Sequence, residues 1–229
     1  MSDVKEHFDK IAAGYDSWKV RNYYYYRNLK KLFAEFIEPG KTVLDFGCGT
    51  GDVLADLKPQ WGSGYDLSTE MVKLAQAKHS NKPNLYFTDV LQHPIIRNRV
   101  YDFIICADVI EHLENVREAV HDIQSLSSDG TKVIITMANP LWEPILFILE
   151  KLKMKMPEGP HQRVKIPELK EILRDEKFVI KQEGYRLLIP TKWFPGADFL
   201  NHKFSYWPLV KKLGLIWYII VTSASHDRS

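Results

Sequence analysis

The sequence predicts an α/β fold: a seven-stranded, mostly parallel sheet with an antiparallel last strand and helices on both faces. The first observation behind this prediction is that short apolar segments alternate with helical segments across residues 42–137, which is typical of successive β-α-β units. The second is a pair of long apolar segments near the C-terminus with no helical segment between them, which favours an antiparallel pair. A chain of 229 residues, 45% of them hydrophobic, is long enough to form one domain of this kind.

The predicted elements follow in order along the chain. Apolar residues recur at helical spacing over residues 3–37, and Pro39-Gly40 ends that segment. The segments rich in β-branched and apolar residues are predicted strands: residues 42–46, 62–66, 85–87, 101–107, 132–137, 178–189 and 213–223. The predicted helices between them are a stretch after residue 51 and residues 68–79, 113–126 and 167–176. The single domain 1–229 thus divides into a helical cap (1–40), an α/β core (41–137) and a C-terminal part (138–229) of insertions and a terminal hairpin.

Composition excludes several classes of protein. The 31 Lys and Arg residues nearly balance the 29 Asp and Glu residues, so the chain lacks the basic character of a dedicated nucleic-acid-binding protein. Two cysteines, Cys48 and Cys106, are too few for a disulfide scaffold or a four-cysteine zinc site. The N-terminus is charged, and the longest apolar run, near residues 213–221, is shorter than a membrane span. We therefore expect a cytoplasmic protein without a nucleic-acid partner.

A glycine-rich loop follows the first predicted strand. Its glycines, Gly47, Gly49 and Gly51, allow positive φ angles and close approach of a ligand to the backbone. The dinucleotide fingerprint is G-x-G-x-x-G, whereas the spacing here is G-x-G-x-G, and Asp52 occupies the position of the third glycine. Asp45 adds a second negative charge near the loop. The loop therefore suits a cationic or zwitterionic ligand better than a pyrophosphate, and NAD is the disfavoured alternative.

Two further acids follow the next predicted strands. Asp66 ends the second strand, where an acid is placed to bind both hydroxyls of a ribose. Asp89 ends the third strand, where the amino group of an adenine could be met. A nucleoside that carries a positive charge and no phosphate matches these acids, and S-adenosylmethionine has that description.

Several segments of the chain resemble the class I S-adenosylmethionine-dependent methyltransferases. The similarity is greatest to the small-molecule branch that includes the ubiquinone/menaquinone-type and polyprenyl O-methyltransferases. The segments that carry it are residues 8–16, 43–51, 65–68, 89–90 and 101–112. The resemblance implies a Rossmann-like sheet, S-adenosylmethionine as methyl donor, S-adenosylhomocysteine as product, and methyltransferase activity.

The resemblance also implies roles for individual residues. The expected cofactor-binding residues are Tyr15, Asp45, Gly47, Cys48, Gly49, Gly51, Asp66, Leu67, Met71, Asp89, Val90, Ala107 and Asp108. Among them, Asp45, the first two loop glycines, Ala107 and Tyr15 are expected at the methionine part of the cofactor. Asp66 is expected at the ribose, and the residues that follow it and Asp89 are expected at the adenine.

The candidate catalytic residues are Glu111, His112 and His161. Methyl transfer from a sulfonium is an in-line displacement, so the protein mainly aligns the reacting atoms, and a general base helps when the acceptor is a hydroxyl. Asp108, Glu111 and His112 are expected on one helical face and resemble an E-x-x-E-H set that holds a divalent metal in polyprenyl and small-RNA 2′-O-methyltransferases. The same residues occur without metal in the wider family, so no metal site is predicted.

The acceptor is expected to be a small, apolar, aromatic or lipid-linked molecule. Three segments rich in apolar and aromatic residues, accompanied by lysines, indicate this: residues 23–26, 139–156 and 190–212. The same segments fit a lid packed on the sheet, or a shallow contact with an anionic membrane. An RNA 2′-O-methyltransferase and a non-catalytic cofactor-binding subunit stay open as alternatives, and the sequence does not determine the oligomeric state.

Overall fold

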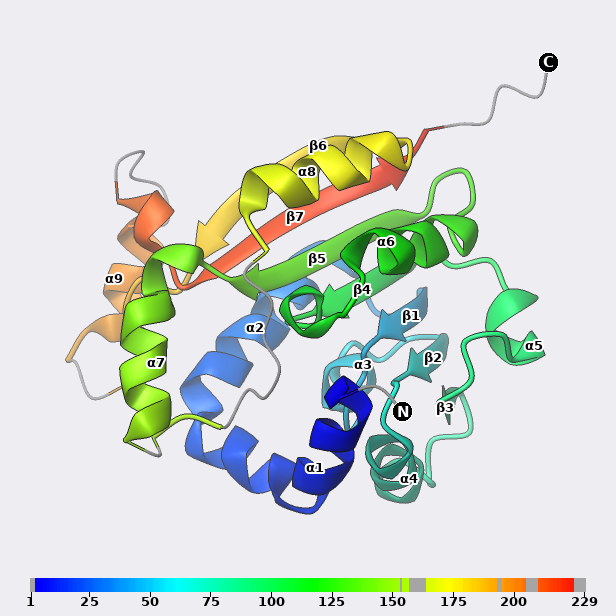
Figure 1. The fold of residues 1–229 in the computed structure, drawn as a ribbon, viewed down its shortest axis with the longest axis horizontal. Helices are drawn as coiled ribbons and strands as arrows, with labels where there is room; N and C mark the ends of the chain where they lie inside the picture. Colours follow the sequence, from blue (N-terminus) through cyan, green and yellow to red (C-terminus); the bar gives the residue numbers. More distant parts are fainter. Residues whose placement is uncertain (1–2, 153, 157–163, 193–194, 205–209, 225–229) are drawn as a thin grey trace.

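A computed structural model describes residues 3–152, 154–156, 164–192, 195–204 and 210–224. Seven strands form one sheet in the order β3-β2-β1-β4-β5-β7-β6 (Figure 1). The strands are β1 (Thr42–Phe46), β2 (Trp61–Tyr65), β3 (Leu85–Thr88), β4 (Phe103–Ala107), β5 (Lys132–Ala138), β6 (Phe178–Arg186) and β7 (Ile216–Ser223). The first five run parallel and β7 runs antiparallel to both of its neighbours, which confirms the predicted fold class.

The strand order reverses next to β1. From β1 the chain proceeds outward to β2 and β3, then returns to β4 on the other side of β1. In open α/β sheets, ligands bind in the crevice at such a reversal, outside the carboxyl ends of the strands. The topology therefore places a binding crevice at the ends of β1 and β4, where the glycine-rich loop begins.

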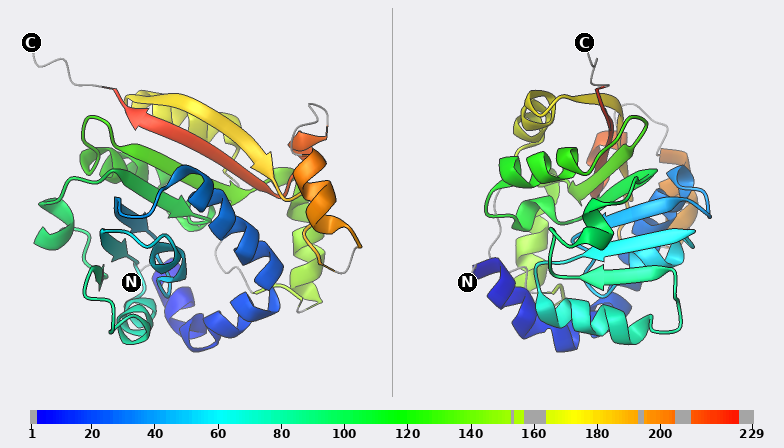
Figure 2. Two further views of the ribbon diagram at one scale, coloured as in Figure 1. Left: turned by 180° about the vertical axis from the view of Figure 1, so that it is seen from behind. Right: turned by 90° about the vertical axis from the view of Figure 1, so that its right-hand side faces the viewer.

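Helices cover both faces of the sheet. The longer ones are α1 (Asp3–Arg21), α2 (Tyr23–Phe36), α4 (Thr69–Lys78), α6 (Val116–Ser125), α7 (Glu143–Lys151), α8 (Ile166–Asp175) and α9 (Ala197–Phe204); α3 (Asp52–Asp56) and α5 (Pro94–Arg97) are short. The apolar faces of α6 and α8 pack into one core cluster, and those of α2, α3 and α4 pack into a second. Figure 2 shows α6 and α8 on the opposite side of the sheet from α2.

Several predicted elements differ from the structure in their bounds, and the helical segment predicted over residues 3–37 is two helices, α1 and α2. The helix predicted over residues 113–126 begins only at Val116, because the Asn115 side chain caps it by accepting a hydrogen bond from the backbone N–H of Glu118. Residues Ile110–His112 form a separate 3₁₀ turn, η1. The last two predicted strands, 178–189 and 213–223, are shorter at the ends that face each other along the chain, and Leu187, with φ of +62°, follows β6.

Candidate active site

A cavity of about 1240 Å³ opens at the carboxyl ends of β1, β2 and β4. The glycine-rich loop forms one wall, the N-terminal helices α1 and α2 form another, and α7 closes the side opposite β2 (Figure 1). Most of the predicted site residues line it: Tyr15, Asp45, Gly47, Cys48, Gly49, Asp66, Leu67, Met71, Ala107, Asp108, Glu111 and His112. Gly51, Asp89 and Val90 are not part of this wall, and His161 lies outside the described residues.

The first loop glycine is required by a close approach of another segment. Gly47 has φ of +83°, and a Cβ atom at this position would lie 2.3 Å from a methyl carbon of Val109. The backbone N–H groups of Gly47 and Cys48 both donate to the carbonyl oxygen of Tyr65, at 2.7 Å and 2.9 Å. These contacts hold the loop tightly against the ends of β2 and β4, so the loop is formed before any ligand arrives.

The third loop glycine has a structural role instead of the expected place in the cavity wall. Gly51 has φ of +77° and begins α3. A Cβ atom there would lie 2.6 Å from the ring of Phe87. This position therefore needs glycine because the rings of Phe87 and His79 lie against it.

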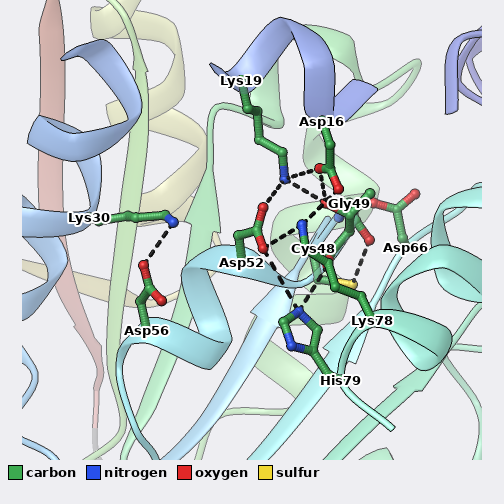
Figure 3. A network of polar contacts seen from close by, with 11 residues as sticks. Asp16, Lys19, Lys30, Cys48, Gly49, Asp52, Asp56, Asp66, Lys78 and His79 are labelled. Atoms are coloured by element: carbon green, nitrogen blue, oxygen red, sulfur yellow. Dashed lines mark hydrogen bonds and ion pairs between the residues drawn. The ribbon is translucent and has the colours of Figure 1, made fainter. Parts of the chain in front are cut away.

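Asp66 is held by two backbone donors at the end of β2. Its Oδ2 accepts a hydrogen bond from the N–H of Gly49 at 2.7 Å (Figure 3). Its Oδ1 accepts one from the N–H of Ser68 at 2.9 Å. Burial raises the pKa of Asp66 to about 6, although these two hydrogen bonds lower it. The carboxylate is thus fixed in place beside the glycine-rich loop, with further lone pairs left for hydroxyl donors.

Asp45 is the most deeply buried acid of the site. The residue is 1% exposed, and its Oδ1 has no hydrogen-bond partner among the described residues. Burial and then the charge of Asp66 raise the pKa of Asp45 to about 8, against weaker opposing effects of Lys19 and of the Leu54 backbone. A positively charged group arriving nearby would favour the ionised carboxylate.

The predicted adenine residues divide into two sets. Leu67 and Met71 line the cavity as expected. Asp89, by contrast, accepts a hydrogen bond from the Thr69 hydroxyl at 2.6 Å, and Val90 is half exposed. The apolar part of the expected adenine site is therefore in the cavity wall, whereas its polar part lies beside it.

An ion-pair network joins α1 to the glycine-rich loop. The Nζ of Lys19 pairs with Asp16 and Asp52, and the Nζ of Lys78 pairs with the same two carboxylates at 2.7 Å (Figure 3). Burial alone would raise the pKa of Asp52, but the two lysines lower it. The sequence predicted that Asp52 repels anions, but lysines from two other elements compensate its charge. The acidic character of the cavity therefore depends on Asp45 and Asp66.

Tyrosines from the N-terminal helices cover the loop. The ring of Tyr15 lies 3.4 Å from the position that a Cβ of Gly49 would occupy. The Tyr25 hydroxyl donates to Oδ2 of Asp108 at 2.6 Å, and Tyr26 also lines the cavity. Burial raises the pKa of all three phenols, so they are neutral hydrogen-bonding groups at pH 7. Sequence reasoning placed Tyr25 and Tyr26 on the acceptor side and did not predict the contact with Asp108.

The expectation that Asp108, Glu111 and His112 share one helical face is wrong. Asp108 has φ of +55° and precedes the 3₁₀ turn, and it accepts hydrogen bonds from Tyr25 and from the Thr136 hydroxyl. The His112 ring packs edge-on against Phe8 instead, with ring centres 5.3 Å apart. Among the described residues, no three His, Cys, Asp or Glu side chains are grouped so that they could hold a metal ion.

Glu111 belongs to this turn, and its side chain is buried. Its Oε1 accepts a hydrogen bond from the N–H of Ala138 at 3.4 Å, whereas its Oε2 has no partner among the described residues. Burial and the neighbouring Asp108 raise the pKa of this carboxyl. Lys155, one of the lysines that accompany segment 139–156, also lines the cavity, and burial lowers its pKa although Glu150, Glu111 and Asp108 oppose this. Nothing in the local pattern around Lys155 distinguishes it from a surface lysine.

Comparison with known proteins agrees with this geometry. A family model described as a methyltransferase domain matches residues 17–183. The chain is 31% identical over 137 residues to an uncharacterised protein of Methanocaldococcus jannaschii, covering 59% of this chain and 52% of that protein. It is 28% identical over 172 residues to the ubiquinone biosynthesis O-methyltransferase of Glaesserella parasuis, covering 68% of this chain and 72% of that protein. The match thus spans about half of the first relative's length.

Solved structures share the fold. The magnesium protoporphyrin IX methyltransferase of Synechocystis PCC 6803, solved with bound SAH, is 21% identical with a TM-score of 0.62, covering 97% of this chain and 100% of that chain. A methyltransferase of Haloferax volcanii, solved in complex with the activator Trm112, is 17% identical with a TM-score of 0.69, covering 94% and 97%. The family model spans the glycine-rich loop, both cavity acids and the Glu111 turn, and the chain belongs to the methyltransferase-domain family of class I S-adenosylmethionine-dependent methyltransferases.

Proposed function

We propose that this chain binds S-adenosylmethionine in the cavity and transfers its methyl group to a small apolar, aromatic or lipid-linked acceptor. One observation carries the proposal: two carboxylates, the buried Asp45 and the half-buried Asp66, stand at the carboxyl ends of β1 and β2 on either side of a preformed glycine-rich loop. A ligand that fits them offers hydroxyl donors to Asp66 and positive charge to Asp45. A phosphate would meet the negative charge of Asp66, and it would oppose ionisation of Asp45.

The residues around these acids suit the parts of such a cofactor. Asp66, with both oxygens already held by backbone donors, would accept hydrogen bonds from the ribose hydroxyls. Leu67 and Met71 would pack against the adenine, with Asp89 and Val90 at its outer edge. The methionine end would lie near Asp45, where the unpartnered Oδ1 marks a place for a donor or a cation. The remaining predicted contacts belong to the same wall: Tyr15, Gly47, Cys48, Gly49, Ala107 and Asp108.

When bound, the cofactor supplies a methyl group on a sulfonium, which is itself a good leaving group. The protein's task is then alignment of the acceptor and, for a hydroxyl acceptor, removal of its proton. Glu111 is the favoured proton acceptor because its Oε2 lacks a partner among the described residues and its raised pKa makes the carboxylate, once ionised, a stronger base. His112, on the same cavity wall, is the second candidate.

The acceptor side of the cavity is apolar. Trp142, Leu146 and Leu149 line it from the segment that contains α7, and Tyr25 lines it from α2. Planar or long apolar acceptors gain most from such a wall. The G. parasuis relative is named for ubiquinone biosynthesis, which is consistent with an acceptor of this class.

Isothermal titration followed by labelling tests the proposal. We expect S-adenosylmethionine and S-adenosylhomocysteine to bind the purified protein, and NAD and ATP not to bind. With radiolabelled methyl donor and cell extract, we expect label in the fraction soluble in organic solvent. The reverse preference, for NAD or ATP over the adenosyl ligands, would refute the cofactor assignment.

The same experiment separates the alternative functions. Label in nuclease-sensitive material would indicate an RNA 2′-O-methyltransferase. Cofactor binding without any labelled product would indicate a non-catalytic subunit, or a need for a partner such as the activator bound to the Haloferax protein.

A pair of variants tests whether Glu111 accepts the proton of the acceptor. Glu111→Gln should lower kcat about a hundredfold while leaving cofactor binding unchanged. His112→Gln serves as the matched comparison on the same turn. Unchanged turnover in both variants would remove the two residues from proton transfer.

A further inference from the structure

Helix α7 carries apolar residues on both of its faces. Successive residues of a helix turn by about 100°, so its nine residues define two faces. The half-buried face carries Leu146 and Leu149 together with two acids, Glu143 and Glu150. The other face leaves Ile145, Phe147 and Ile148 exposed. A surface helix normally places its charged residues toward water and its apolar residues toward the core. Exposure of the outer face of α7 to water is therefore unfavourable.

The outer apolar face continues beyond both ends of the helix. We call this surface the α7 face, and its large apolar members are Leu141, Ile145, Phe147, Ile148, Leu152 and Met154. Each is between 47% and 64% exposed. Single exposed apolar residues are common, but six of them within fourteen residues indicate a surface that meets another apolar phase.

Lysines accompany this apolar surface. Lys151, the exposed charged residue of α7, holds its Nζ 4.5 Å from the ring centre of Phe147. On α9, Lys203 lies in the same way 5.3 Å from the ring of Phe199, which is also exposed. Figures 1 and 2 place α7 and α9 at the end of the molecule toward which β4 and β5 point, but the right-hand view of Figure 2 shows them on opposite sides of it, so Lys203 lies outside the α7 face. Lysines whose stems lie along exposed aromatic rings fit the boundary between acyl chains and anionic headgroups.

We propose that the α7 face docks peripherally on an anionic lipid bilayer. Within the described part of the chain, no helix has the length and apolar character needed to span a membrane, so the contact is superficial. The apolar side chains would enter the headgroup boundary, and Lys151 would remain at the level of the phosphates. A membrane is favoured over a protein partner because the exposed apolar face has an exposed lysine, Lys151, at its rim.

Docking at this face would bring the cavity next to the membrane. Ile145 and Met154 belong to the α7 face and also line the cavity, and Leu149 lines it from the inner side of α7. A lipid-linked acceptor could therefore pass from the bilayer to the cavity along α7. Only this last consequence rests on the proposed function; the docking itself depends on the surface alone.

Vesicle co-sedimentation without cofactor tests the proposal. The wild-type protein should bind vesicles that contain phosphatidylglycerol and bind phosphatidylcholine vesicles much more weakly. The double variant Phe147→Ser/Ile148→Ser should lower the partition coefficient at least about tenfold. Lys151→Gln should lower it about fivefold on the anionic vesicles only.

The matched control removes apolar surface elsewhere. Val100→Ser/Val179→Ser changes two exposed valines, at 70% and 43% exposure, and should bind vesicles like the wild type. Thermal unfolding and S-adenosylmethionine titration of each variant show whether it folds and whether the cofactor site is intact. Vesicle binding by a protein that ignores the cofactor would contradict the proposed function and leave the docking proposal standing.

Three results would overturn the docking proposal. One is no association of the wild type with anionic vesicles at low salt. Another is vesicle binding by the Phe147→Ser/Ile148→Ser variant that is as strong as that of the wild type. The third is a wild-type dimer that becomes monomeric in this variant, as measured by light scattering, because the α7 face would then cover a second copy of the chain.

Discussion

Cofactor binding should release a proton from Asp45, and this prediction tests the electrostatics of the site directly. The pKa of this buried carboxyl is raised to about 8, so at pH 7 only about one molecule in eleven carries the charge. A cationic ligand favours the ionised form, so binding at pH 7 must first remove the proton. The apparent dissociation constant should therefore be about tenfold larger at pH 7 than at pH 9.

Calorimetry in two buffers with different ionisation enthalpies measures the proton directly. We expect release of roughly 0.9 proton per ligand at pH 7 and nearly none at pH 9. Asp45→Asn keeps the shape of the side chain and removes the titration, so it should abolish both the release and the pH dependence. The ligand's own protonation is common to both proteins and cancels in the comparison. Equal proton release in the variant and the wild type would refute the assignment of the cation to Asp45.

Three further predictions concern ligand-free stability, the ribose site and the glycine-rich loop. Because the folded-state pKa values of Asp45 and Asp66 lie above their unfolded values, the folded protein holds more protons, and stability falls as pH rises from about 4 to about 8. The ligand-free melting temperature should be about 5–10 °C lower at pH 8 than at pH 6, and a flat profile by calorimetry would contradict this. Asp66→Ala should weaken S-adenosylmethionine binding about a hundredfold, whereas Asp89→Asn, outside the cavity wall, should change it by less than about threefold in the same titration. Gly47→Ala should destabilise the fold by about 2 kcal/mol or more in urea unfolding, because its Cβ would meet Val109 and its φ is +83°; a wild-type midpoint would show that the loop relaxes freely.

The local sequence pattern alone predicts the part of the candidate site that lies at the ends of β1 and β2. The alternation of strands and helices predicts a parallel sheet, and parallel strands bring their carboxyl ends to one edge. Asp45, Asp66 and the loop between them follow from that rule without any knowledge of tertiary contacts. Leu67 and Met71 follow as well, because they lie in the turn and helix directly after Asp66.

The tertiary structure decided what distant segments do to these residues. Asp52 is compensated by Lys19 and Lys78, which reach it from α1 and α4, and no spacing in the sequence predicts that meeting. Asp108 departs from helical geometry, with hydrogen bonds from Tyr25 and Thr136 on two other elements. Its left-handed backbone separates it from the following turn, which is why the expected shared face does not form.

The same distinction applies to α7. Apolar residues in segment 139–156 predict a surface that avoids water, but periodicity does not say which face meets the cavity and which is left outward. Packing decides this: the acids of α7 take the half-buried side, and Phe147 and Ile148 are left exposed. The sequence therefore determined which side chains stand near the end of each strand. The fold decided which of these side chains are neutralised, buried or exposed, because charge and burial depend on neighbours that are remote along the chain.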